Sequence, residues 1–327
     1  MKKILISRTD GIGDLLLTTP LIKAVKESEG HPYVAVMAGK YASSVLENSP
    51  DLDEIIIYDT DKRQELIKSI KNSRFDACIC VFPRFDTASL LAFAGIPRRI
   101  GTAYRWFSTL FFNEPVSVHR KHSLKHESNY NLELAESIIG EKTADKVYYY
   151  TSKEEQEKAR EYVKKKGLAP EFIIIHPGSK GSAWNISEAK YIETVDKAAE
   201  FAKVLLTGGP DEKEKITRMR EKMNNMEKVV LLEENMPIRE FAAIIGESSL
   251  LVSGSTGPMH LAAALGVKTL NFFPPDEVKA MRVKRWGPVG NINEIIMPAS
   301  SGQHPGQAME TISTDFIIDK IKNLLAR

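Results

Sequence analysis

The chain has 327 residues, 43% of them hydrophobic and 27% charged, which is typical of globular domains with full cores. Its length predicts about two domains, and its formal net charge of +2 argues against general nucleic-acid binding. No run approaches the roughly 18 apolar residues of a membrane-spanning helix. The opening MKKILISRTDG predicts a strand and not the apolar core of a signal peptide. We therefore expect a cytoplasmic protein with no nucleic-acid partner.

Strands and helices alternate through the N-terminal half. Short apolar runs predict strands, and the segments between them have helical spacing. The expected strands are 3–7, 33–37, 54–58, 77–82 and 99–101, and the expected helices are 15–27, 41–48, 62–72 and 87–94. This alternation favours parallel strands buried on both faces. Cys78 and Cys80 lie two apart in one strand, and we expect them to be free thiols in the core.

The alternation stops between residues 98 and 126. This stretch has six Lys or Arg, three His and a single acid, Glu114, and its aromatic residues suggest an irregular, apolar excursion. Its basic residues include Arg120 and Lys121. The stretch is either a surface for a phosphorylated ligand and a membrane, or a solvated loop around a small aromatic core.

A second alternating series follows. Ser152 and Glu155 indicate a capping box at its first helix. The expected strands are 172–176, 203–207, 229–232, 250–253 and 269–273, and the expected helices are 152–166, 186–202, 212–223, 238–246, 259–265 and 315–325. The whole pattern predicts an α/β protein with two Rossmann-like, doubly wound parallel-sheet domains facing a central cleft. The expected boundaries are 1–150 and 151–310, with a final helix within 311–327.

The turn after the first strand, RTDGIGD, carries candidate site residues. Gly11 and Gly13 are expected to let the backbone turn tightly, but Leu16 replaces the third glycine of a dinucleotide fingerprint, so NAD binding is not expected. Asp14 stands at the start of the next helix. It either caps that helix or acts as a general base at the mouth of the cleft.

Two turns of the second series suit a phosphorylated ligand. HPGSKGSAW is not a Walker loop, yet Lys180 among Gly and Ser is either a phosphate clamp or a solvated side chain. In TGGPDE, Gly208 and Gly209 would allow a ligand to approach closely. Asp211 or Glu212 would then accept a ribose hydroxyl, or simply cap a helix.

A third turn, SGSTGPMH, leads into an Ala-rich helix. The unpaired N–H groups and positive dipole of a helix that opens near Gly257 favour an anion. Ser255 and Thr256 add hydroxyl donors, and His260 lies in the first helical turn. An ordinary helix cap is the alternative. Three such loops at the strand ends of one domain would bind a nucleotide diphosphate.

Asp59-Thr60-Asp61 has the D-x-D pattern that binds a divalent metal in one class of sugar-nucleotide enzymes. Here it follows a strand and precedes a helix near Lys62, so we interpret it as a helix cap. Elsewhere no His or carboxylate cluster has convincing ligand spacing. We therefore expect no metal.

Four segments in this order, ILISRTDGIGDLLLTTPLIKAVK, HPGSKGSAW, VLLTGGPDEKE and SGSTGPMHLAAALGVKTLNFF, resemble glycosyltransferase family 9, the heptosyltransferases of bacterial lipopolysaccharide core assembly. The resemblance covers nearly the whole chain. It implies a GT-B fold with an N-terminal acceptor domain, a C-terminal donor domain and a final helix that often crosses back. It also implies inverting transfer without metal or cofactor, from a nucleotide-sugar donor, usually ADP-heptose, to a lipopolysaccharide-core or related glycolipid acceptor. The site would be cytoplasmic or peripheral at the inner membrane.

The resemblance assigns roles by position. Asp14 matches the base that deprotonates the acceptor hydroxyl, with Gly11, Gly13, Arg120 and Lys121 on the acceptor side. The donor-side positions are Ser179, Lys180, Gly208, Gly209, Glu212, Met236, Ser255, Thr256, Gly257 and His260. Among them, Ser179 and Lys180 would hold the diphosphate and Met236 would contact the nucleobase.

The sequence departs from the family pattern twice. Ser255 stands where a heptosyltransferase typically has Asp, and the usual phosphate-loop Lys falls near Ser182, which leaves Lys180 to substitute. Both departures leave the donor sugar open. Two other hypotheses therefore stay open as well: a nucleotide-sugar 2-epimerase of the same fold, and a sugar-nucleotide-binding protein without transfer.

Overall fold

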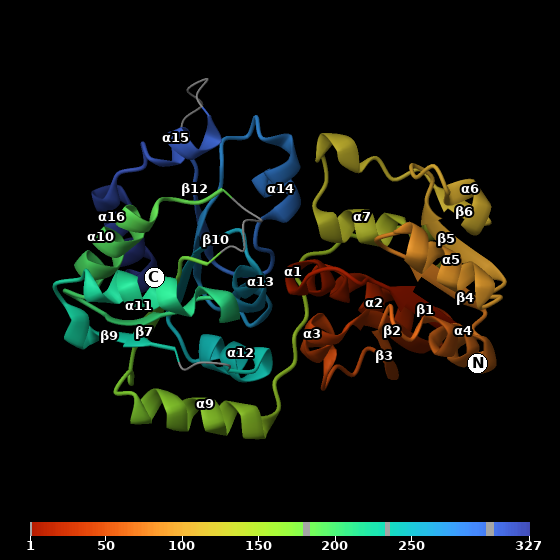
Figure 1. Cartoon of the computed structure of the whole chain (residues 1–327), viewed down its shortest axis with the longest axis horizontal. Helices are drawn as coiled ribbons and strands as arrows, with labels where there is room; N and C mark the ends of the chain where they lie inside the picture. The colour runs from red at the N-terminus through yellow and green to blue at the C-terminus, as the bar shows by residue number, and fades with distance from the viewer. Residues whose placement is uncertain (1, 179–183, 233–235, 299–303) are drawn as a thin grey trace. The chain divides into compact units, whose positions relative to one another are not determined.

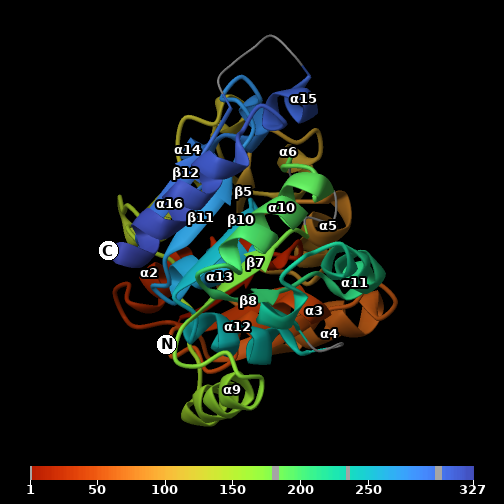
Figure 2. The ribbon, with the colours of Figure 1, turned by 90° about the vertical axis from the view of Figure 1, so that its left-hand side faces the viewer.

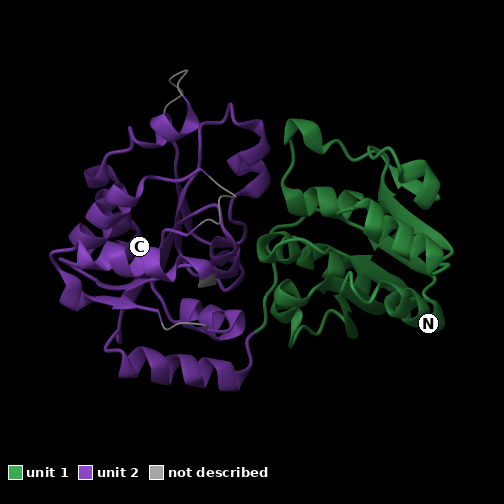
Figure 3. Ribbon diagram, in the orientation of Figure 1, with its two compact units in different colours: residues 1–150 green, residues 151–327 purple. Residues whose placement is uncertain are grey.

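The chain forms two compact units in the computed structural model, Met1–Tyr150 and Thr151–Arg327 (Figure 3). The structure describes residues 2–178, 184–232, 236–298 and 304–327. Each unit contains one six-stranded sheet with helices around it (Figure 1). Neighbouring strands run parallel throughout both sheets, as their apolar character predicted.

The sheet of unit 1 has the order β3-β2-β1-β4-β5-β6. Its strands are β1 (Lys3–Ser7), β2 (Tyr33–Gly39), β3 (Glu54–Tyr58), β4 (Ala77–Cys80), β5 (Arg98–Thr102) and β6 (Glu114–Val116). Leu5 of β1 and alternate residues of β2 and β4 pack into one core with helices α4 (Arg63–Ser73) and α5 (Phe85–Phe93), and Cys78 and Cys80 belong to this core. Both are free and buried, which confirms the expected core thiols.

Unit 1 has more helices than the sequence predicted. They are α1 (Ile12–Leu16), α2 (Thr19–Lys26), α3 (Lys40–Ser43), η1 (Ser44–Leu46), α4 (Arg63–Ser73), α5 (Phe85–Phe93), α6 (Ser108–Phe111), η2 (Arg120–His122), α7 (Glu127–Glu133) and α8 (Glu136–Ile139). The single helix expected over 15–27 is two helices, because Pro20 lies at the start of α2 and has no N–H to continue the hydrogen-bond ladder. The expected irregular excursion over 98–126 is also wrong in part, since it contains β5, α6, β6 and η2.

The sheet of unit 2 has the order β12-β11-β10-β7-β8-β9, which is the same winding as in unit 1. Its strands are β7 (Phe172–His176), β8 (Lys203–Leu206), β9 (Val229–Leu231), β10 (Leu250–Gly254), β11 (Thr269–Phe272) and β12 (Asn293–Ile296). The sequence missed β6 and β12. Both are short edge strands that carry charged or proline residues, so neither has an apolar run.

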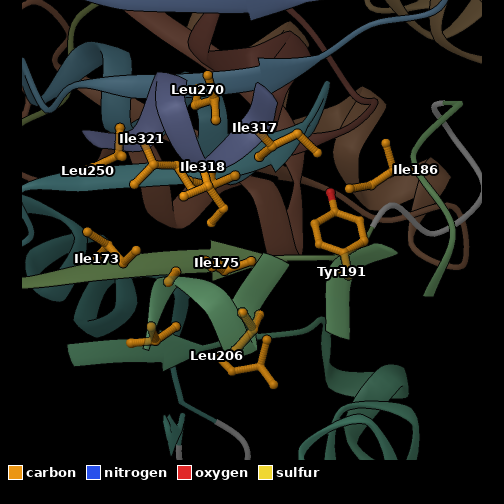
Figure 4. Packing of buried hydrophobic residues seen from close by; sticks show 14 of the residues in the cluster. Ile173, Ile175, Ile186, Tyr191, Leu206, Leu250, Leu270, Ile317, Ile318 and Ile321 are labelled. Atoms are coloured by element: carbon orange, nitrogen blue, oxygen red, sulfur yellow. The ribbon is translucent and has the colours of Figure 1, made fainter. Parts of the chain in front are cut away.

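Helices cover both faces of this second sheet. They are α9 (Lys153–Lys165), α10 (Glu188–Ala198), η3 (Pro210–Glu212), α11 (Lys213–Glu221), η4 (Met226–Lys228), α12 (Ile238–Gly246), α13 (Gly257–Ala264), η5 (Lys279–Met281), α14 (Val283–Trp286), α15 (Pro305–Met309) and α16 (Thr314–Ala326). The closing helix, α16, lies beside α10 over one face (Figure 2). Its Ile317, Ile318 and Ile321 join Tyr191 and alternate strand residues in the main core of unit 2 (Figure 4).

Helix α9 begins unit 2 and is joined to α12 by an ion pair. Ser152 caps it, because its side chain accepts the Glu155 N–H while Glu155 accepts the Ser152 N–H, which confirms the predicted capping box. Glu155 also accepts two hydrogen bonds from the mostly buried Arg239 of α12. Burial alone would raise the pKa of Glu155, but these donors hold it below its usual range.

We predict that Glu155→Gln lowers the free energy of unfolding by about 2 kcal/mol, because Arg239 loses the charge of the Glu155 carboxylate and the cap is weakened. Urea unfolding monitored by circular dichroism measures this. Glu154→Gln is the matched control, since Glu154 pairs with the exposed Lys158 of its own helix and should change stability little. Equal losses of unfolding free energy in the two variants would show that the Glu155–Arg239 ion pair adds nothing to stability.

Candidate functional site

The strand order defines one switch point in each sheet. In unit 1 it lies between β1 and β4, and in unit 2 between β7 and β10. On either side of such a point the chain continues toward opposite faces of the sheet, so the loops after the two strands separate and leave room for a ligand at their carboxyl ends. The turns with Asp14 and with Thr256 follow β1 and β10, as the sequence predicted.

A buried histidine ends β7 at the switch point of unit 2. His176 pairs in register with Ser253 of β10, and its Nδ1 lies 2.9 Å from the Thr207 hydroxyl after β8. Burial lowers the pKa of His176 to about 4. The ring is therefore neutral at pH 7 and serves as a fixed hydrogen-bonding group, a role that the sequence did not suggest.

The turn after β8 is occupied by the protein's own side chains. The Gly209 N–H donates to Glu212 Oε2 at 2.8 Å, so Glu212 caps the start of η3. A Cβ atom on Gly208 would lie 2.6 Å from Ile216 Cγ1 and 3.3 Å from the Glu212 Cβ. The space beside Gly208 is thus filled by Ile216. The ribose contact of Glu212 stays a prediction.

The N-terminus of α13 keeps its backbone donors. Thr256 is the N-cap residue, but its side chain makes no cap bond, and its buried Oγ1 has no hydrogen-bond partner within the described part of the chain. The ordinary-cap interpretation is therefore wrong for this side chain. His260, which is buried, donates its own N–H to the Thr256 carbonyl at 3.4 Å. Gly257 is the first residue of the helix and Pro258, which has no N–H, is the second, so the helix presents the Gly257 N–H beside the Thr256 hydroxyl, an arrangement that suits a phosphate.

Asn185, in the loop after β7, lies close against the end of β10. Its Oδ1 accepts a hydrogen bond from the Tyr191 hydroxyl at 2.8 Å. A Cβ atom on Gly254 would lie 2.9 Å from Asn185 Nδ2, so only glycine allows this approach. Sequence reasoning missed Asn185, because nothing in the local sequence marks a contact with a strand more than sixty residues later.

Of the other donor-side candidates, the structure describes some and not others. Ser179 and Lys180 lie outside the described residues, as does Ser182. Met236 is half-buried just before α12, and Ser255 is half-buried in the turn after β10. Their roles toward a ligand stay predictions.

A buried arginine organises the turn after β1. Arg8 is 2% exposed, and its guanidinium binds Asp10 at 2.7 Å, Asp14, and Glu127 of α7 at 3.4 Å. Three acids raise the pKa of Arg8 although burial opposes this, so the cation is permanent. Burial raises the pKa of Asp10 to about 6, although Arg8 opposes the rise.

Asp14 does not cap its helix. It lies in the first turn of α1, whose N-cap residue is Gly11, and one of its oxygens binds Arg8. Its side chain is 29% exposed, so it can reach a ligand in solvent. The expected glycine turn is wrong in its detail, since Gly11 has an ordinary φ of −75° and Gly13 lies within α1.

The two basic acceptor-side candidates differ. Arg120 is mostly buried and belongs to the Arg8 cluster, because its Nε lies 3.3 Å from Glu127 Oε1 and its Nη2 donates to Asn131 Oδ1 at 3.0 Å. Lys121 is exposed on η2. The structure thus places Arg120 among protein partners and leaves Lys121 facing solvent.

The D-x-D segment forms a local turn. Asp59 Oδ1 accepts the Asp61 N–H at 3.0 Å, whereas α4 starts at Arg63 with Lys62 as N-cap. The predicted cap is therefore wrong, because the carboxylate bonds inside its own turn. Among the residues that the structure describes, no three His, Cys, Asp or Glu side chains are grouped to hold a metal ion.

Two parallel sheets of the Rossmann type, each with polar groups at its switch point, are the architecture of the GT-B class of α/β proteins. The sequence model of "Glycosyltransferase family 9 (heptosyltransferase)" matches residues 63–313, and the chain belongs to this family of glycosyltransferases. The match starts after the turn that carries Asp14.

Known proteins support the same assignment over the full length. A Haemophilus influenzae protein provisionally assigned as a glycosyltransferase is 29% identical over 337 aligned residues, covering 98% of this chain and 96% of the relative. A family 9 glycosyltransferase structure from Veillonella parvula has a TM-score of 0.85 at 19% identity, covering 99% and 97% of the two chains. The structure of Escherichia coli ADP-heptose LPS heptosyltransferase II has a TM-score of 0.82 at 19% identity, covering 99% and 98%. Both structures confirm the predicted fold.

We predict that His176 makes the protein less stable as pH falls. Its pKa is about 4 when folded and near 6.5 in an unfolded chain. Between these values the unfolded state binds the extra proton, so stability is lost on acidification, by about 2 kcal/mol from pH 6.5 to 5.

Urea unfolding of wild type and His176→Asn across this range tests the prediction. The variant should lack this part of the loss of unfolding free energy on acidification, whatever its stability at pH 7. His31→Asn, at an exposed position, should follow the wild-type profile. Parallel profiles for His176→Asn and wild type would contradict the neutral buried ring.

Proposed function

We propose that the protein is an inverting, metal-independent glycosyltransferase that needs no cofactor and moves a sugar from a nucleotide-sugar donor, most simply ADP-heptose, to a lipopolysaccharide-core or related glycolipid acceptor. Family membership supports sugar transfer. The name of the Escherichia coli structural neighbour, an ADP-heptose LPS heptosyltransferase, supports this donor and acceptor. The observation that carries the mechanism is the partly exposed Asp14 fixed to a buried Arg8 at the switch point of unit 1.

Asp14 would act as the general base. Arg8 binds its Oδ1, which orients the carboxylate and leaves Oδ2 to accept the proton of an acceptor hydroxyl. The acceptor oxygen then attacks the anomeric carbon, the bond from that carbon to the diphosphate breaks, and the nucleoside diphosphate leaves. Attack opposite the leaving group inverts the anomeric configuration.

The turn into α13 would stabilise the leaving group. The Gly257 N–H and the Thr256 hydroxyl can donate to the β-phosphate as its charge develops. Ser255 and His260 would complete this side, Ser179 and Lys180 would clamp the diphosphate, and Met236 would contact the nucleobase. Glu212 would meet the ribose from the turn after β8.

We predict that Asp14→Asn lowers the rate of transfer by about 10²- to 10⁴-fold, because the amide cannot accept the proton. Nucleoside diphosphate binding should be unchanged. Single-turnover transfer and calorimetric titration with ADP measure the two quantities.

Asp10→Asn is the matched control, since Asp10 is also a carboxylate bound to Arg8. It should keep transfer within about tenfold of wild type if Asp10 only positions Arg8. Near-normal turnover of a folded Asp14→Asn protein would exclude the base role. Loss of nucleotide with no acceptor present would favour a 2-epimerase, and donor binding without hydrolysis or transfer would favour a binding protein.

We predict that ADP and ADP-sugars raise the thermal midpoint more than UDP, GDP or dTDP compounds do. A ligand at 100 times its Kd adds about 2.7 kcal/mol of stability. Thr256→Val should weaken ADP binding, because a phosphate donor is lost. Thr194→Val is the control, since Thr194 is another buried hydroxyl of unit 2 but lies in the core on α10. A larger shift with UDP than with ADP would reject the proposed donor.

A further inference from the structure

Three large apolar side chains of unit 1 are exposed at the start of α5, just before α6 and on α6. Trp106 is 79% exposed, Leu110 65% and Phe85 49%. The rings of Phe85 and Trp106 stack with centroids 5.5 Å apart. We call these three residues, two aromatic and one aliphatic, the aromatic face.

The aromatic face has a rigid base. Phe85 packs edge-on against Phe107 at 5.9 Å and Phe111 at 5.3 Å, and Trp106 packs edge-on against Phe107 at 5.5 Å. Phe107 and Phe111 are buried in the main core of unit 1. The exposed rings are therefore held in place by the core and are not free loop side chains.

The surroundings of the aromatic face are basic. From Thr87 to Asn113 the sequence has no Asp or Glu and three Arg. Arg84 directly precedes Phe85 and Arg105 directly precedes Trp106, and both are exposed. The next residue along the chain after Phe85, Asp86, accepts the Tyr58 hydroxyl at 2.6 Å and lies 3.5 Å from Arg84, so these two charges offset each other in part and Arg105 adds a further positive charge.

This combination fits the surface of an anionic bilayer better than another protein. Trp and Phe insert at the level of lipid headgroups, and Arg is attracted by anionic lipid. Three side chains of at most about 250 Å² each, none fully exposed, offer less than the roughly 800 Å² per partner of a standard protein interface. Within the described part of the chain no helix could cross a membrane, so contact through this face would be peripheral.

We propose that the aromatic face, with Arg84 and Arg105, docks unit 1 on an anionic lipid bilayer. Phe85, Trp106 and Leu110 enter the headgroup region, and the two arginines bind lipid phosphates. This goes beyond the transfer reaction, and it is testable without a donor or an acceptor.

Trp106 itself reports on docking. The chain has three Trp, so the variant Trp184→Phe/Trp286→Phe leaves Trp106 as the sole tryptophan, whose emission can be excited selectively over that of tyrosine. We expect its emission to shift to the blue with vesicles of phosphatidylglycerol and phosphatidylcholine, and to stay unchanged with phosphatidylcholine alone. Binding should weaken as salt is added, because ionic screening reduces the lipid–Arg attraction.

Vesicle co-sedimentation of otherwise wild-type variants measures the contributions. Phe85→Ser and Trp106→Ser should each lower partitioning on the order of tenfold, and Arg84→Ser or Arg105→Ser about fivefold. Phe316→Ser is the matched control, since Phe316 of α16 in unit 2 is 48% exposed, nearly as much as Phe85. This control should bind vesicles like wild type.

Four results would overturn the proposal: no blue shift, equal binding to neutral and anionic vesicles, an equal loss in Phe316→Ser, or a dimer that Trp106→Ser dissociates in sedimentation velocity. The last would make the aromatic face a contact between copies of the chain. Thermal stabilisation by ADP, measured on the same variants, separates this test from the proposed function. Trp106→Ser should keep that stabilisation while losing vesicle binding.

Discussion

The parallel pairing of β7 with β10, and of β1 with β4, is the constraint on which both candidate sites depend. These strands are distant in sequence, so the chain must cross the sheet before it pairs them, and the loops after them are left apart. Register then brings His176 beside Ser253, and from there the turn into α13 follows within a few residues. A shift of this register by one residue would turn the ring of His176 to the other face of the sheet. The site chemistry is therefore fixed by backbone hydrogen bonds before any side chain contributes.

The two units bury polar groups at these points in opposite ways. Unit 1 keeps a permanent charge, Arg8, and offsets it with three carboxylates. Unit 2 keeps an uncharged imidazole whose partner is a hydroxyl. The first arrangement can hold a carboxylate in one orientation next to solvent, which suits proton removal. The second adds no positive charge of its own, so an anion placed there would be attracted by the α13 N-terminus.

The sequence predicted what local pattern determines. Strands 3–7, 54–58 and 172–176 and helix 238–246 have the expected bounds, because each is an apolar run or an amphipathic segment between clear breaks. Edge strands such as β6 gave no such signal. Nor did Glu127, which meets Arg8 from 119 residues away, or Gly208, whose missing side chain makes room for Ile216. The sequence could locate Asp14 and the α13 turn, but the residues that hold them depend on tertiary contacts that a single sequence does not contain.

The ion pair between Glu155 of α9 and Arg239 of α12 limits where recombination could exchange one unit for another during evolution. Unit 2 starts at Thr151, and Glu155, in the first turn of its first helix, is already bonded to a helix more than eighty residues later. A recombination junction placed after α9 would separate Glu155 from Arg239 and break this largely buried ion pair. A junction at the end of unit 1 would keep the pair together. The natural module to exchange is therefore the stretch that ends before Ser152, with α9 inherited alongside the sheet of unit 2.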